Sequence, residues 1–146
     1  MASAVTEIVE AAGAHVPVVL ARIEERLAVL ADGHGPVLAG HAGTTIAAGG
    51  KRLRPLLVVI AARDRTGDGV VRAGVAVELV HSATLVHDDV LDGAALRRGR
   101  PTVVAEGGRA AAIATGDHLF ARAFAELAAG GNPDAVRALS VASSAL

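Results

Sequence analysis

Cysteine, tryptophan and tyrosine are missing from this sequence, and phenylalanine occurs only twice in 146 residues. Without cysteine, neither a disulfide framework nor a thiolate metal site can form. Because aromatic side chains are so scarce, a core has to be built from alanine, valine, leucine and isoleucine, and a hydrophobic share of 52% can fill one. Such small side chains suit close packing of helix against helix, so we expect one all-α domain over residues 1–146.

Long hydrophobic runs and an excess of charge of one sign are lacking as well. The longest uninterrupted apolar run, Pro55 to Ala62, is far shorter than the roughly 20 residues that cross a bilayer, so we expect no transmembrane helix. Glu7 and Glu10 stand where a secretory signal would carry a basic stretch, and we therefore predict a cytoplasmic protein. A net charge of −1, with basic residues in a few short clusters, argues against general nucleic-acid binding.

Apolar residues recur at spacings of three and four along most of the chain, which predicts helices. The expected helices cover residues 5–30, 36–48, 71–91, 109–128 and 134–146, and a further helix with Pro55 in its first turn continues to Ala62. Pro17 is expected to split or kink the first of them. Glycines at positions 33, 35, 49, 50, 93, 107 and 108 are expected to end or interrupt helices.

Carboxylates cluster at the end of the predicted helix over residues 71–91. Asp88 and Asp92 lie one turn apart, about 40° around the helix axis, and His81 and Thr84 fall on the same face. These carboxylates, together with Asp89, repel one another at the negative end of the helix dipole, so a cation is favoured there. Oxygen ligands without cysteine favour a hard ion such as Mg²⁺, whereas the alternative is a solvated acidic helix end.

Two basic clusters flank this acidic face. Lys51, Arg52 and Arg54 crowd a helix start, where the positive end of the dipole and free backbone N–H groups suit an anion such as phosphate. A second basic group, residues 97–102, follows the aspartates closely. Each cluster alone is compatible with an exposed basic turn. Together with the acidic face they indicate a diphosphate site, in which Mg²⁺ bridges carboxylates to phosphate oxygens.

The three segments have a familiar order. GGKRLRP at 49–55, HSATLVHDDVLD at 81–92 and RRGRPT at 97–102 resemble the first three signature blocks of the trans-isoprenyl diphosphate synthases, the polyprenyl synthetase family. ATGD at 114–117 resembles the start of that family's next helix, and the likeness extends over about Leu38 to Leu146. The resemblance implies an all-α helical bundle of the isoprenoid synthase type, truncated to its N-terminal half.

The resemblance also implies an activity, a magnesium-dependent prenyl transfer in isoprenoid biosynthesis. An allylic diphosphate ionises to a carbocation, the double bond of isopentenyl diphosphate attacks it, and a proton is lost, while metal and basic residues stabilise the departing diphosphate. The roles implied for this chain are Mg²⁺ ligation by Asp88 and Asp92 with Asp89 in support, allylic diphosphate binding by Arg97, and isopentenyl diphosphate binding by Lys51, Arg54, His81 and Arg98. Asp88, Asp92 and Arg97 are the expected catalytic residues.

Product length is expected to depend on the residues that precede the aspartates. In the family, the residues four and five positions before the first aspartate form the floor of the product cavity when they are bulky. Here Ala83 and Thr84 are small, which predicts products longer than C15. The alternative is that both are ordinary packing residues.

The sequence departs from the family pattern in one respect. Family members are longer and carry a second aspartate-rich motif, but no Asp-Asp or Asp-x-x-Asp follows Asp92. Three alternatives follow: a fragment of a full synthase, a short subunit completed by a partner, or a binding half without turnover. We expect a homodimer, or association with a chain that carries the missing half.

The remaining histidines and both phenylalanines lack such patterns. We expect surface positions for His15, His34 and His41, packing or hydrogen bonding for His87 and His118, and core positions for Phe120 and Phe124.

Overall fold

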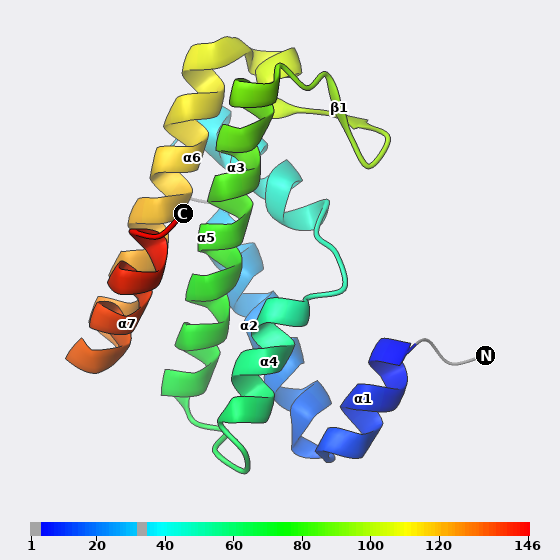
Figure 1. Cartoon of the computed structure of the whole chain (residues 1–146), viewed down its shortest axis with the longest axis vertical. Helices are drawn as coiled ribbons and strands as arrows, with labels where there is room; N and C mark the ends of the chain where they lie inside the picture. The colour runs from blue at the N-terminus through cyan, green and yellow to red at the C-terminus, as the bar shows by residue number, and fades with distance from the viewer. Residues whose placement is uncertain (1–3, 32–34) are drawn as a thin grey trace.

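A computed structural model describes residues 4–31 and 35–146, and within them the protein is all-α, as predicted (Figure 1). Seven helices and one two-stranded hairpin occur in these residues. They are α1 (Ala4–Ala12), α2 (His15–Ala31), α3 (Pro36–Ala47), α4 (Leu53–Ala61), α5 (Asp68–Asp92), β1 (Leu96–Arg97), β2 (Arg100–Pro101), α6 (Val103–Ala129) and α7 (Pro133–Ser143).

Helix α5 is the centre of the bundle. It packs against α6 along much of its length and against α4 and α2 on other sides, and Figure 1 shows it running through the middle of the molecule. Val75, Leu79, Ala83 and Val86 of α5 are buried in the core, with Ile23 and Leu27 of α2 and Leu119 of α6. The core is aliphatic, as the scarcity of aromatics predicts.

By length and composition alone, α5 is also apolar enough to cross a membrane. More than half of its most apolar window, 56%, is buried inside the bundle. A core helix of a helical bundle has the same composition, so this finding gives little weight to a membrane span.

The predicted break at Pro17 is wrong. Helices α1 and α2 meet at an angle of 113°, and the chain turns at Gly13, whose φ of 117° is in the region that favours glycine. Pro17 lies instead in the first turn of α2, where a missing N–H has no intrahelical partner to lose. The expected helix end at Gly33 lies outside the described residues, as does His34.

Other boundaries lie close to their predicted places. Gly93 ends α5 with a φ of 61°, and Gly108 kinks α6 with a φ of 80°. Helix α5 begins three residues earlier than expected, at Asp68. The prediction that the last helix continues to residue 146 is wrong, because α7 ends at Ser143.

A buried ion group joins three helices. Glu126 of α6 is 4% exposed and accepts hydrogen bonds from Arg26 of α2, at 2.6 and 3.0 Å, and from Arg72 of α5, at 3.0 Å. We refer to Arg26, Arg72 and Glu126 as the core ion cluster. A buried carboxylate requires such partners, so the cluster fixes α2, α5 and α6 relative to one another.

Candidate functional site

Two connecting segments lie beside the C-terminal half of α5. One is the loop at residues 48–52, between α3 and α4, and the other is the β1–β2 hairpin, which Figure 1 shows extending from the end of α5. The hairpin pairs Leu96 with Pro101 and Arg97 with Arg100, and it reverses at Arg98 and Gly99, both with positive φ. Thr102 closes its base, because its Oγ1 donates to the carbonyl of Ala94 at 2.6 Å and accepts from the amide of Ala105.

Lys51, Arg54, His81 and Arg98 line a single pocket. The other lining residues are Gly50, Arg52, Leu53 and Glu78, and we call this site the basic pocket. Lys51 and Arg54 are exposed, and neither forms an ion pair with any residue that the structure describes. The fold therefore brings together, from α4 and its preceding loop, from α5 and from the hairpin, the residues that the resemblance implies for isopentenyl diphosphate.

His81 is the titratable group at the centre of this pocket. Its pKa is lowered below the ordinary value, first because the ring is partly buried and then because Arg54, Arg98 and Arg97 are positive, while Glu78 opposes the shift. A lowered pKa keeps the imidazole neutral near pH 7, with one N–H to donate and one nitrogen to accept.

Arg52 does not point into solvent with its two basic neighbours. Its side chain is 16% exposed, and its guanidinium binds Glu24 of α2 and Glu78 of α5, the latter at 2.8 Å. It also donates to the carbonyl of Ile46, at the end of α3, at 2.9 Å. We refer to Arg52, Glu24 and Glu78 as the pocket ion cluster. Of the three cations predicted to attract an anion here, one is thus already paired by the protein.

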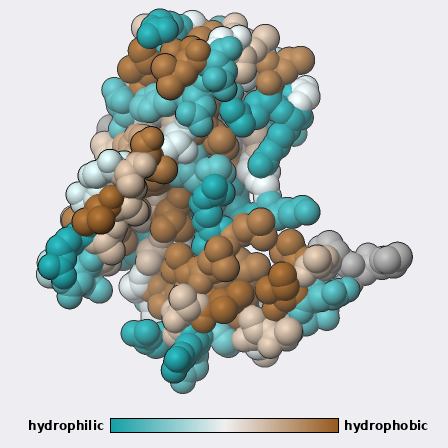
Figure 2. Space-filling view, viewed as in Figure 1, coloured by the Kyte–Doolittle hydropathy of each residue, from teal (hydrophilic) through white to brown (hydrophobic). Residues whose placement is uncertain are grey.

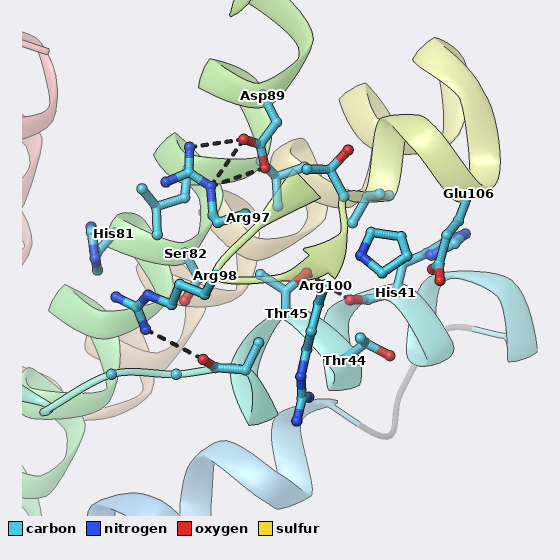
Figure 3. A pocket seen from close by; sticks show the side chains of 18 of the residues that line it. His41, Thr44, Thr45, His81, Ser82, Asp89, Arg97, Arg98, Arg100 and Glu106 are labelled. Carbon is cyan, nitrogen blue, oxygen red and sulfur yellow. Dashed lines mark hydrogen bonds and ion pairs between the residues drawn. The ribbon is translucent and has the colours of Figure 1, made fainter. Parts of the chain in front are cut away.

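The glycine pair before Lys51 leaves room for two guanidinium groups. A Cβ atom on Gly49 would overlap the guanidinium of Arg52. A Cβ atom on Gly50 would lie 2.9 Å from both terminal nitrogens of Arg98, whose Nη1 donates to the carbonyl of Ala48 at 3.3 Å (Figure 3). The pair therefore permits close side-chain approach as well as a turn.

The acidic end of α5 divides its three aspartates between two environments. Asp88 and Asp92 are exposed, and no ion pair involves either of them in the described part of the chain. Asp89 is 5% exposed and accepts from Arg97, with Nη2 at 2.8 Å and Nε at 2.9 Å from its Oδ1 (Figure 3). The pKa of Arg97 is raised, chiefly by the hydrogen bond to Asp89 and also by the charges of Asp88 and Asp92.

These contacts give Asp89 a definite structural task. It fixes the guanidinium of Arg97 in the electrostatic field of the two exposed aspartates. Its supporting role in Mg²⁺ binding stays a prediction. No group of three histidine or acidic side chains converges on a metal position in the described residues. Asp88 and Asp92 are two hard oxygen donors, a number that suits Mg²⁺ completed by water and phosphate oxygens.

A second cavity adjoins the basic pocket beneath the hairpin. It shares Gly50, Glu78, His81 and Arg98 with that pocket, and Figure 3 shows His41, Ser82, Arg100 and Glu106 among the other residues around it. His41, predicted at the surface, has intermediate exposure. Its ring is partly buried, lines this cavity, and would lie 2.7 Å from a Cβ atom on Gly107.

The two residues predicted to control product length differ in exposure. Ala83 is fully buried in the core, whereas Thr84 is partly buried and its hydroxyl donates to the carbonyl of His81 at 2.8 Å. In the described residues Ala83 is thus a packing residue of the bundle. The effect of both residues on product length stays a prediction.

His87 packs and forms polar contacts, as predicted. Its ring stacks on Phe120 with 5.9 Å between centroids, and its Nε2 lies 3.3 Å from Oδ1 of Asp117. A Cβ atom on Gly116 would overlap the His87 ring, so the glycine of the ATGD segment permits this close contact between α5 and α6. Phe120 and Phe124 are partly buried against the core.

Glu78 is the main site residue that the sequence analysis missed. It is a single carboxylate inside an apolar stretch of α5, three residues before His81 on the same face. A charge at a position that periodicity places in the core requires a partner, and this signal could have identified it. Its partner, Arg52, could not be chosen from the sequence among several nearby arginines.

The sequence and the fold are similar to those of known proteins. The sequence model of the polyprenyl synthetase family matches residues 36–146. Heptaprenyl diphosphate synthase component 2 of Geobacillus stearothermophilus is 47% identical over 126 residues, which cover 83% of this chain and 38% of the relative.

Solved structures agree with that match. A polyprenyl synthase from Caulobacter crescentus, complexed with calcium and isoprenyl diphosphate, has a TM-score of 0.82 and 38% identity, and the match covers 99% of this chain and 43% of that one. A decaprenyl diphosphate synthase from Rhodobacter capsulatus has a TM-score of 0.81 and 37% identity, over 96% of this chain and 43% of that one. The chain therefore spans less than half the length of each of these relatives.

Proposed function

Because this chain belongs to the polyprenyl synthetase family, we propose that it supplies the basic pocket and the acidic end of a prenyltransferase site. The reaction is the condensation of isopentenyl diphosphate with an allylic diphosphate. The observation that carries the proposal is the convergence of Lys51, Arg54, His81 and Arg98, from separate segments of the chain, on one pocket. Lys51, Arg54 and Arg98 have no ion-pair partner among the described residues, and such clustered cations suit a small polyanion such as a diphosphate.

Asp88 and Asp92 are the residues that would hold Mg²⁺, since both are exposed and free of ion pairs with described residues. When bound, Mg²⁺ would neutralise charge on the diphosphate that leaves the allylic substrate. Arg97, which Asp89 orients, would contact the same diphosphate and stabilise the negative charge that develops as the C–O bond breaks.

The basic pocket has a separate task. Lys51, Arg54, His81 and Arg98 would hold the diphosphate of isopentenyl diphosphate, so that its double bond is positioned to attack the allylic carbocation. Loss of a proton from the resulting cation then completes the new allylic product. In this arrangement the two diphosphates occupy different regions of the chain, one in the basic pocket and the other at the acidic end of α5.

A second candidate function is diphosphate binding without independent turnover, as a subunit completed by a partner. Leu53, Leu57 and Ile60 on one face of α4 are exposed, and Figure 2 shows hydrophobic residues gathered over this part of the molecule. Apolar patches of this kind mark association surfaces. The name of the Geobacillus relative, component 2, also favours association with a different subunit. The homodimer stays a prediction. A cytoplasmic location stays a prediction.

Calorimetry tests the proposed binding. We expect the chain to bind isopentenyl diphosphate without added metal and an allylic diphosphate only with Mg²⁺. Lys51→Ala with Arg54→Ala should weaken isopentenyl diphosphate binding by about 10- to 100-fold, because two charged contacts are lost. Asp88→Asn with Asp92→Asn should instead remove the Mg²⁺ dependence of allylic diphosphate binding. Equal binding by the parent chain and both double variants would contradict the proposal.

Product formation separates the two candidates. If the purified chain condenses the two substrates, it is a complete enzyme. If it binds both but forms product only after a chain with further carboxylates is added, the partner-dependent function is correct.

A further inference from the structure

The three cations of the loop before α4 differ in their surroundings. Lys51 and Arg54 are exposed and have no ion-pair partner among the described residues. Arg52, between them, has four polar contacts: two with Glu24, one with Glu78 at 2.8 Å, and one with the carbonyl of Ile46 at 2.9 Å. A direct ligand for a diphosphate would keep its donors open, but four of the five N–H donors of Arg52 are already used.

The backbone conformation of Arg52 indicates that these contacts determine the conformation of the loop. Its φ of 49° and ψ of 38° lie in the left-handed region, which costs a residue other than glycine on the order of 1 kcal/mol or more. Such a conformation persists only where surrounding contacts determine it. Here the contacts come from α2, from the end of α3 and from α5, so three helices fix one guanidinium group.

The same contacts fix the position of the loop relative to the other residues that line the pocket. Glu78 is 4% exposed and lies one turn before His81 on α5, and both line the basic pocket with Lys51 and Arg54. Anchoring Arg52 to Glu78 therefore holds its two basic neighbours at a fixed distance from His81. Among the described residues, no other hydrogen bond or ion pair joins the loop at 48–52 to α5.

Electrostatics favours a positioning role over a simple contribution of charge. Arg52 with Glu24 and Glu78 has a net charge of −1, which weakens the attraction of the pocket for an anion. A pocket selected only for positive potential would not place two carboxylates against its wall. In a pocket selected for geometry, this weaker attraction for the anion is offset, because correctly placed charged donors form stronger hydrogen bonds than misplaced ones.

We propose that Arg52 is a positioning residue, which through Glu78 and Glu24 holds Lys51 and Arg54 in the geometry that binds a diphosphate. This inference rests on the proposed function of the basic pocket. It makes an unusual prediction: removal of a negative charge, at Glu78, should weaken the binding of an anion.

The test uses the full chain, inorganic diphosphate as the probe, and two readouts. Calorimetry without metal measures diphosphate affinity, and amide hydrogen exchange of residues 49–54 without ligand measures the order of the loop. Glu78→Gln removes the charge of the anchor, and Arg52→Lys keeps the charge but removes the forked geometry. The matched control is Glu126→Gln, which alters an equally buried, arginine-paired carboxylate in the core ion cluster, none of whose members lines the basic pocket.

We expect Glu78→Gln and Arg52→Lys to bind inorganic diphosphate about three- to tenfold more weakly, the size of one impaired charged hydrogen bond, and to exchange the loop amides faster. Glu126→Gln should change neither readout. If Glu78→Gln does not fold, Arg52→Lys and Glu24→Gln decide the question, since the side chain of Glu24 is 48% exposed and tolerates substitution.

Unchanged or tighter diphosphate binding in both variants would overturn the proposal, and so would unchanged loop exchange or an equal loss in Glu126→Gln. Failure of the proposed function has a different signature. In that case inorganic diphosphate would bind the parent chain and its Lys51→Ala, Arg54→Ala variant equally, whatever the loop exchange of the Arg52 and Glu78 variants.

Discussion

The two ion clusters of this protein use the same chemistry in opposite proportions. In the core ion cluster, two arginines from α2 and α5 bind one buried glutamate of α6. In the pocket ion cluster, two glutamates from α2 and α5 bind one arginine of the loop before α4. Each cluster therefore ties three segments together through a central group with two partners.

The difference lies in what surrounds each cluster. Glu126 lies among packed helices, and its partners Arg26 and Arg72 form no ion pair with any other described residue. Arg52 lies in the wall of a pocket, between two cations that form no ion pair with residues the structure describes. A buried ion group is a costly way to add stability, but its directional contacts suit the fixing of one segment relative to another. We conclude that the core cluster fixes helices, whereas the pocket cluster fixes binding groups.

The largest expected effect comes from breaking the core cluster. Glu126→Ala leaves Arg26 and Arg72 without their shared carboxylate, and because both arginines retain some access to water, we expect a loss of about 2–3 kcal/mol in the free energy of unfolding. Urea denaturation followed by circular dichroism measures this loss. Diphosphate affinity should be unchanged in the folded protein, and a parallel loss of affinity would remove the distinction between the clusters.

Gly74 in the core and Gly50 at the pocket are two glycines at which an added methyl group should have different effects. A Cβ atom on Gly74 of α5 would overlap Cδ1 of Ile23, which is 1% exposed and has no free space to enter. Although alanine favours helix more than glycine does, we expect Gly74→Ala to lower the free energy of unfolding by about 1–2 kcal/mol. Thermal unfolding measures the change, and a stabilised variant would contradict the close packing of α2 on α5.

Gly50→Ala is the counterpart at the pocket. The added methyl would meet the exposed guanidinium of Arg98 at 2.9 Å, and this side chain can move into solvent. Stability should therefore stay within about 0.5 kcal/mol of the parent, while inorganic diphosphate binding falls about two- to fivefold because Arg98 is displaced. Unchanged affinity would place Arg98 outside the binding site.

The smallest expected effect is a dependence of stability on pH. Since the pKa of His81 in the folded protein lies below its unfolded value of about 6.5, the unfolded chain binds more protons as the pH falls through that range. The contribution of the neutral ring to stability is therefore complete above about pH 6.5 and is lost as the pH falls through the lower folded pKa. His81→Gln should lose less stability than the parent in this window, measured by urea denaturation at several pH values.

The order of the helices was predicted from signals close together in the sequence, and the errors in the helix boundaries have local causes as well. The periodicity of α5 and α6 and the glycines at 93 and 108 predicted where those helices end or bend. The chain turns at Gly13 rather than at Pro17, because proline is tolerated in a first helical turn and sequence spacing alone did not identify where α2 begins. The partial burial of His41 was not predicted because it depends on the distant hairpin and on Gly107.

The sequence predicted which residues lie in the candidate site, but it did not predict which charged side chains pair with one another. The motifs named Lys51, Arg54, His81 and Arg98, and the fold gathers them in one pocket. They did not indicate that Asp89, about 100° around the helix axis from Asp88, turns inward to Arg97 while Asp88 and Asp92 stay exposed, because the sequence does not show which side of the helix the bundle and the hairpin cover.

The sequence by itself determined the all-α class, the order of the helices and the one-turn spacing of Asp88 and Asp92, because each depends on residues close together in the chain. Only the tertiary structure decided which charges are paired and which remain open. Arg52 meets Glu24 and Glu78 across 28 and 26 residues of sequence, once core packing has set α2, the loop and α5 side by side. A partly buried charge takes the partner that packing brings within reach, and the charges left over at the surface are those available to a ligand.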